Sequence, residues 1–110
     1  DYCTEIIPGV PTDGPRPRVT LHLAQNYPNP FATRTSIEFR AEEGGHATLE
    51  IYDVAGRRVR TLIDREVGEG LHIAHWNGRD DMGREVTTGV YFYTVKSGDF
   101  SKTMKMTLLK

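Results

Sequence analysis

Apolar and polar side chains alternate along most of the chain after residue 20, with the two-residue period of a β-strand. Ile37 and Phe39 alternate with polar neighbours, and Ala47, Leu49 and Ile51 repeat the pattern in the next segment. The alternation and the β-branched and aromatic runs predict seven short strands. We expect them at 21–25, 35–41, 46–54, 58–64, 71–76, 89–97 and 100–109.

Segments rich in glycine, asparagine and aspartate separate these strands. Residues 43–45 predict a hairpin turn, and residues 53–57 predict a tight reversal in which Gly56 supplies a positive φ. Residues 66–70 and 77–83 predict polar loops. None of the connections is long enough for a crossover helix, so we expect antiparallel pairing. The fold class predicted is an all-β, seven-stranded antiparallel β-sandwich.

The first twenty residues have a different composition, with four of the six prolines. Proline fixes φ and lacks a backbone donor, so residues 1–20 predict an extended linker or arm before a domain of residues 21–110. The apolar pair Ile6 and Ile7 is a candidate for an added edge strand or for self-assembly with a neighbouring chain.

A second proline-containing segment, residues 26–31, follows the first predicted strand. Its two X-Pro steps predict an extended, turning path. Tyr27 and Phe31 are available to pack this path onto the core.

Charge and hydropathy exclude several function classes. The formal net charge of −1, from 14 basic and 15 acidic residues, argues against nucleic-acid binding, which needs a basic excess to neutralise phosphates. There is no apolar run of about 18 residues, so we expect no membrane insertion. The chain starts with neither an initiator Met nor a signal peptide, and we expect it to be part of a longer protein. Its single cysteine, Cys3, forms no internal disulfide.

Candidate chemical sites are few. His72 and His75 project to opposite faces of one strand, and the histidines lack the spacing of a zinc site. Asn77, Asp80 and Asp81 offer three oxygen donors and form a weak calcium candidate. Such residues also terminate strands by bonding their own backbone, which is the interpretation that we favour. There is no nucleophile elbow and no phosphate-binding loop, so we expect neither an enzyme nor a cofactor.

The aromatic residues near the C-terminal strands allow two interpretations. Tyr91 and Tyr93 share one face of the 89–97 strand, Phe92 lies on the other, and Trp76 ends the preceding strand. An exposed aromatic row would form a carbohydrate-binding platform. A small sandwich also needs bulky rings to fill its interior, and we favour this second interpretation.

Several sequence blocks together resemble a known family. The blocks Asn26–Phe31, Leu49–Val59, Trp76–Gly83, Gly89–Tyr93 and Lys105–Lys110 occur in this order. The chain resembles the type A C-terminal sorting domain of the type IX secretion system. It is also similar to the immunoglobulin-like C-terminal domain of flagellar hook-capping proteins.

The resemblance implies an immunoglobulin-like sandwich at the end of a larger exported protein, linked covalently to an upstream cargo domain. An outer-membrane translocon would bind it, and a sortase-like peptidase would cut the linker before Leu21. The protein would cross the periplasm to the cell surface or the extracellular space. The contact residues would lie in the closing hairpin: Gly89, Tyr91, Lys102, Lys105, Leu108, Leu109 and Lys110.

Simple physical arguments agree with a partner at this hairpin. A terminal edge strand carries unpaired backbone groups that another protein can extend by strand addition. Lys102, Lys105 and Lys110 make that end locally basic. Two alternatives stay open: a structural building block of a fibre or surface assembly that docks through its N-terminal arm, and a carbohydrate-binding module.

Overall fold

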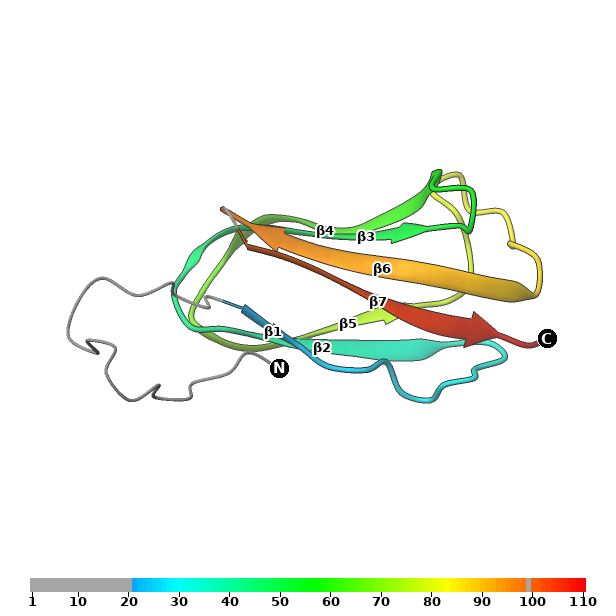
Figure 1. Ribbon diagram of the computed structural model, residues 1–110, viewed down its shortest axis with the longest axis horizontal. Coiled ribbons are helices and arrows are strands. Elements are labelled where there is room, and N and C mark those ends of the chain that lie inside the picture. The colour runs from blue at the N-terminus through cyan, green and yellow to red at the C-terminus, as the bar shows by residue number, and fades with distance from the viewer. Residues whose placement is uncertain (1–20, 99) are drawn as a thin grey trace, which may run out of the picture.

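The computed structural model describes residues 21–98 and 100–110, and every regular element in them is a β-strand (Figure 1). The predicted arm, with Cys3, Ile6 and Ile7, lies outside the described residues. The seven strands are β1 (Leu21–Leu23), β2 (Thr35–Ala41), β3 (Gly45–Tyr52), β4 (Arg58–Val67), β5 (Gly70–Trp76), β6 (Gly89–Ser97) and β7 (Phe100–Leu108). The described part of the chain contains no helix that could cross a membrane.

The strands form two sheets that face each other across one core (Figure 1). One sheet has three strands in the order β1-β2-β5, and the other has four in the order β4-β3-β6-β7. Every pair of neighbouring strands is antiparallel. The predicted all-β, seven-stranded sandwich is confirmed.

The core consists of the residues whose alternation predicted the strands. Ile37 and Phe39 enter it from β2, and Ala47, Leu49 and Ile51 enter it from the opposite sheet. Met106 and Leu108 of β7 are fully buried, because they occupy alternate positions on its inner face. Each sheet thus buries the apolar side chains of one face away from water. This burial is the main favourable contribution to the free energy of folding.

Two predicted connections are wrong. Residues 43–45 do not close a hairpin, since β2 belongs to the three-stranded sheet and β3 to the other. Turn residues reverse a chain equally well within a sheet and between two sheets. The predicted 66–70 loop is shorter, because β4 continues to Val67 and pairs there with Gly45.

The segment between β1 and β2 is bonded closely to the core, through buried Asn26. The backbone N–H of Asn26 donates to the Tyr93 hydroxyl at 2.8 Å, and that hydroxyl donates to the Ala24 carbonyl at 2.8 Å. Phe31 is buried, as predicted, but Tyr27 is 80% exposed, so its predicted packing is wrong. Tyr27 forms a backbone bridge with Ser36 that leaves its ring outside.

Candidate functional site

The β6–β7 hairpin contains the residues expected to contact a partner. Two of them, Tyr91 and Leu108, are buried in the core. The Tyr91 hydroxyl donates to the Thr87 carbonyl at 2.7 Å, which ties β6 to the loop before it. Gly89 pairs with Leu108 across the hairpin. These three residues therefore support the end of the sandwich and offer little side-chain surface to a partner.

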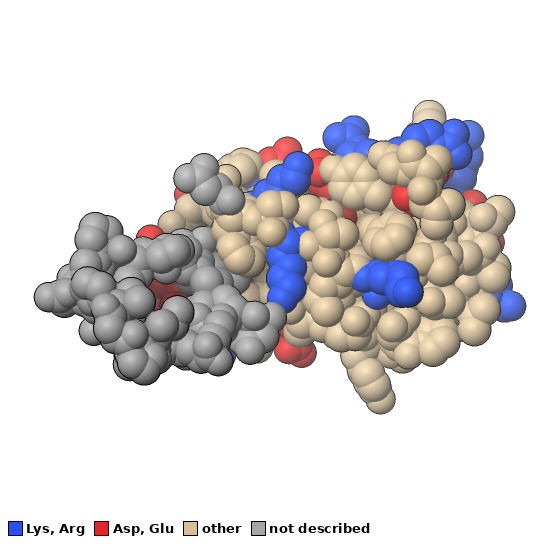
Figure 2. Space-filling model, in the orientation of Figure 1, with Lys and Arg blue, Asp and Glu red and all other residues tan. Residues whose placement is uncertain are grey.

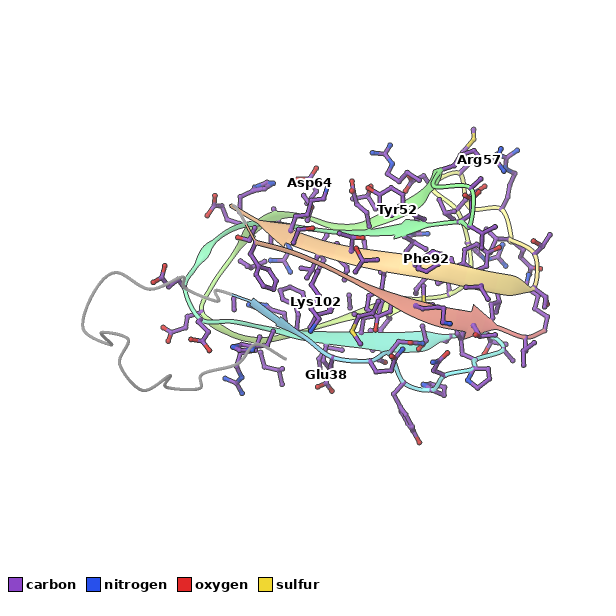
Figure 3. All side chains as sticks on the ribbon, viewed as in Figure 1. Glu38, Tyr52, Arg57, Asp64, Phe92 and Lys102 are labelled. Atoms are coloured by element: carbon purple, nitrogen blue, oxygen red, sulfur yellow. The ribbon has the colours of Figure 1, made fainter. Side chains whose placement is uncertain are left out.

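The three lysines of β7 and its end do not form one basic patch. Lys102, labelled in Figure 3, pairs with buried Val95 on the inner face, whereas Lys105 is exposed and pairs with Phe92 on the outer face. Lys110 Nζ lies 3.3 Å from Glu85 Oε1, so its charge is matched locally. Successive side chains of a strand point to opposite faces, which separates the first two lysines.

The edge of β7 is largely covered toward its end, which corrects the expectation of an open terminal edge. The N–H of Phe31 donates to the Thr107 carbonyl at 3.0 Å, and the N–H of Leu109 donates to the Phe31 carbonyl at 2.8 Å. The side chain of Asn29 accepts from the Thr107 N–H at 2.9 Å, and Gln25 donates to the Lys105 carbonyl. The segment before β2 thus blocks strand addition along this part of the edge.

What remains exposed at this end is the tip after β7. Leu109 is 51% exposed, and Lys110 follows it. The backbone of Lys110 is held, because its N–H donates to the Thr88 hydroxyl at 3.0 Å. The tip therefore presents an apolar side chain and a lysine in a fixed position.

The aromatic side chains favoured as core residues are in the core. Trp76, Tyr91 and Tyr93 are all buried. The Trp76 ring packs edge-on against Tyr91, with centroids 5.5 Å apart, and lies 5.7 Å from the Phe31 ring. A carbohydrate platform built from these rings would need exposed faces that they do not have.

The loop proposed as a weak calcium site uses its side-chain oxygens to bind backbone N–H groups. Asp80 Oδ1 accepts from the N–H groups of Met82 and Arg84, at 2.9 Å each. Asp81 Oδ1 accepts from the Thr61 N–H at 3.0 Å, and Asn77 Oδ1 accepts from the Arg79 N–H at 3.2 Å. Asn77 and Asp80 thus have the turn geometry favoured from the sequence, whereas Asp81 binds strand β4.

The turn between β3 and β4 repeats this arrangement. Asp53 Oδ1 accepts from the N–H groups of Ala55 and Arg57, at 2.9 Å each, and Asp53 Oδ2 lies 3.1 Å from Arg57 Nε. In the other loop, Asp80 Oδ2 lies 3.3 Å from Arg84 Nε. We call segments 53–57 and 80–84 the twin turns.

A repeated five-residue pattern in the sequence marks the twin turns. Both segments have the pattern Asp-x-x-Gly-Arg. Gly56 and Gly83 have φ values of +84° and +82°, a conformation that favours glycine. The pKa of Asp53 is lowered, chiefly by the hydrogen bond from the Arg57 backbone N–H. The pKa of Asp80 is lowered in the same way, chiefly by the Arg84 backbone N–H. Both carboxylates therefore stay ionised at neutral pH.

An open hollow of about 350 Å³ lies where the twin turns meet. Its lining is Asp53, Arg57, Arg58, Val59, Asp80, Asp81, Met82, Arg84 and Val86. The second turn is held against β4, since the Asp81 N–H donates to the Val59 carbonyl at 3.0 Å. In Figure 2, basic side chains gather at this end of the molecule.

A hydroxyl and an imidazole meet on the outer face of the three-stranded sheet. Ser36 Oγ lies 2.9 Å from His75 Nδ1, and both side chains point away from the core. A hydrolytic triad also needs an acid bonded to the imidazole. Among the described residues, no acidic side chain bonds to His75. The same part of the chain contains no group of three or more His, Cys, Asp or Glu side chains that could hold a metal ion.

The family model for the FlgD Ig-like domain matches residues 29–100, which is more than half of the chain. The chain belongs to the FlgD Ig-like domain family. The similarity expected from the ordered sequence blocks is thereby confirmed. A comparison with curated protein sequences gives no match.

Two solved structures contain the same fold as this FlgD Ig-like domain. One is dimeric latent PorU from Porphyromonas gingivalis, with 22% identity and a TM-score of 0.66. The chain is covered over 88% of its length but spans 10% of PorU. The other is PorZ of the same organism, described as an essential surface component of its type IX secretion system. Identity there is 23% and the TM-score 0.54, over 78% of this chain and 11% of PorZ.

Proposed function

We propose that this FlgD Ig-like domain is a non-catalytic sorting and anchoring domain of a larger exported protein. An outer-membrane translocon binds it at the closing hairpin while the upstream cargo is carried to the cell surface. A sortase-like peptidase then acts on the linker before the sandwich. The similarity to a fold found in PorZ, a surface component of a type IX secretion system, supports this assignment.

The observation that carries the proposal is the held and exposed tip after β7. Leu109 is 51% exposed although Leu108, beside it, is fully buried. The bonds of Leu109 to Phe31 and of Lys110 to Thr88 hold the backbone at both residues of the tip. A partner that binds a pre-ordered segment loses less conformational entropy on binding, so a fixed apolar tip is suited to recognition.

Exchange of the tip tests the proposal. A reporter fused before the full chain is exported in a bacterium that has a type IX secretion system, and its amount at the surface is measured. The double variant Leu109→Asp/Lys110→Glu removes the apolar contact and reverses the charge. We expect surface reporter to fall about tenfold, as for loss of a contact residue at the centre of an interface.

Controls separate recognition from folding. Leu108 must be kept, because it is fully buried and its loss would damage the core. Lys96→Glu is the matched control, since Lys96 is exposed on β6 of the same hairpin. An unchanged amount of surface reporter for the tip variant, with an unchanged melting temperature, would contradict recognition at the tip.

A further inference from the structure

The hollow between the twin turns has features that the proposed sorting role does not use. Three arginines line it: Arg57, Arg58 and Arg84. Asp53 and Asp80 each bind the Nε of the arginine in their own turn. The two guanidinium groups are therefore oriented from within the loops (Arg57 is labelled in Figure 3).

These ion pairs use the Nε atoms and leave the Nη atoms of Arg57 and Arg84 available for a ligand. Among the described residues, none accepts a hydrogen bond from the Nη atoms of Arg57, and Arg84 Nη2 contacts only the Met82 sulfur, at 3.4 Å. Arg58 has two distant acidic neighbours, Glu50 at 3.7 Å and Asp81 at 3.9 Å. An arginine fork binds a carboxylate through two parallel hydrogen bonds.

Apolar side chains flank the same hollow. Met82 lines it and is 76% exposed. Val59 and Val86 of the lining are partly buried and pack against the core. Exposed apolar groups beside free cationic forks fit a ligand that has both a carboxylate and aliphatic side chains.

The acids in the lining disfavour a polyanion. Asp53, Asp80 and Asp81 balance the three arginines, so the lining has no net positive charge. A nucleic acid or polyphosphate would place many negative charges against these acids. An isolated carboxylate can instead bind the outward guanidinium nitrogens of Arg57 and Arg84, because Asp53 and Asp80 are turned into their loops and Asp81 is bonded to β4.

We propose that the hollow between the twin turns binds a short acidic peptide segment of a partner protein, in which a glutamate lies between aliphatic residues. The carboxylate binds the forks of Arg57 and Arg84. The neighbouring aliphatic side chains pack against Met82 and the partly buried Val59. The hollow is at the lower end of the volumes that ligand pockets have, which suits a tripeptide rather than a folded domain.

The three methionines provide a direct test on the full chain. With ¹³C-labelled methionine methyl groups, NMR follows a titration with acetyl-Leu-Glu-Leu-amide. We expect the Met82 signal to shift and saturate, while the signal of buried Met106 stays in place and reports an intact core. The neutral peptide acetyl-Leu-Gln-Leu-amide should bind about tenfold more weakly, because it lacks the charge-assisted bonds.

Matched variants assign the effect to the two forks. Arg57→Gln/Arg84→Gln should weaken binding about tenfold, and Arg57→Lys/Arg84→Lys should weaken it less, since lysine keeps the charge without the fork. Arg40→Gln, at an exposed arginine of β2, should leave binding unchanged. Three results would overturn the proposal: equal binding of the glutamine peptide, equal binding by the Arg→Gln variant, or equal saturation by inorganic phosphate. The titration does not depend on export, so its outcome is independent of the sorting role.

Discussion

At the scale of single residues, Tyr93 connects strand β6 to the segment after β1 through one hydroxyl group. This group accepts from the Asn26 N–H and donates to the Ala24 carbonyl, both at 2.8 Å. The segment after β1 is thereby fixed to β6, 67 residues later in the chain. Burial raises the pKa of Tyr93 to about 12, so the neutral form is the one that the fold favours.

Tyr93→Phe should lower the free energy of unfolding by about 1–3 kcal/mol, because it leaves two backbone groups without their partner. The pKa of Tyr93 is higher in the folded state than its ordinary value of 10.0. Its contribution is therefore complete below pH 10 and is lost as the pH rises toward about 12. Urea unfolding at pH 8 and pH 11 checks both effects. Tyr27→Phe, at an 80% exposed ring, is the control; equal pH dependence in the two variants would contradict this role of Tyr93.

The sequence did not distinguish the two aromatic residues of segment 26–31. Tyr27 and Phe31 have similar size and both adjoin a proline, yet one is exposed and the other buried. Their orientations depend on backbone bridges to residues outside the segment, Tyr27 with Ser36 and Phe31 with Leu108. Local sequence pattern contains no information on such partners.

At the scale of elements, the strands were predictable and their assignment to sheets was not. Ile37 and Phe39 alternate with polar residues, as do Met104 and Met106, and this pattern identifies a strand with one face toward the core. It does not say which sheet a strand joins, so the sequence alone predicts a hairpin at 43–45. The cover on the β7 edge is not predictable from this pattern for the same reason, since it comes from Phe31.

The twin turns give a prediction at this scale. Gly56→Ala should destabilise the domain by about 1–2 kcal/mol, because a Cβ is strained at φ +84° even where no atom lies within 4 Å. Gly68→Ala is the matched control, since it also has open space but no positive φ. There we expect a neutral or slightly stabilising effect, from the lower entropy of the unfolded chain. Thermal unfolding compares the two; equal destabilisation would show that φ is not the cause.

At the scale of the whole molecule, the two-sheet sandwich displays the twin turns and the tip after β7 at one end (Figure 1). The turn between β3 and β4, the connection between β5 and β6, and the C-terminal tip lie at this end, opposite the start of β1 (Figure 1). Only part of the predicted set of contact residues is accessible to a partner, because the side chains of Tyr91 and Leu108 are buried in the core. Leu109, Lys110 and the outward-facing Lys105 are the members of that set whose side chains are exposed, and the first two form the tip after β7.

The central claim, that this domain directs export, is tested most directly by moving it to another protein. A periplasmic reporter with a signal peptide carries the full chain at its C-terminus, in a bacterium with a type IX secretion system. Surface reporter is measured in the parent strain and in a strain without the translocon. The account predicts surface reporter in the parent and periplasmic retention in the mutant. Equal amounts at the surface of both strains, or no gain over the reporter without the domain, would contradict it.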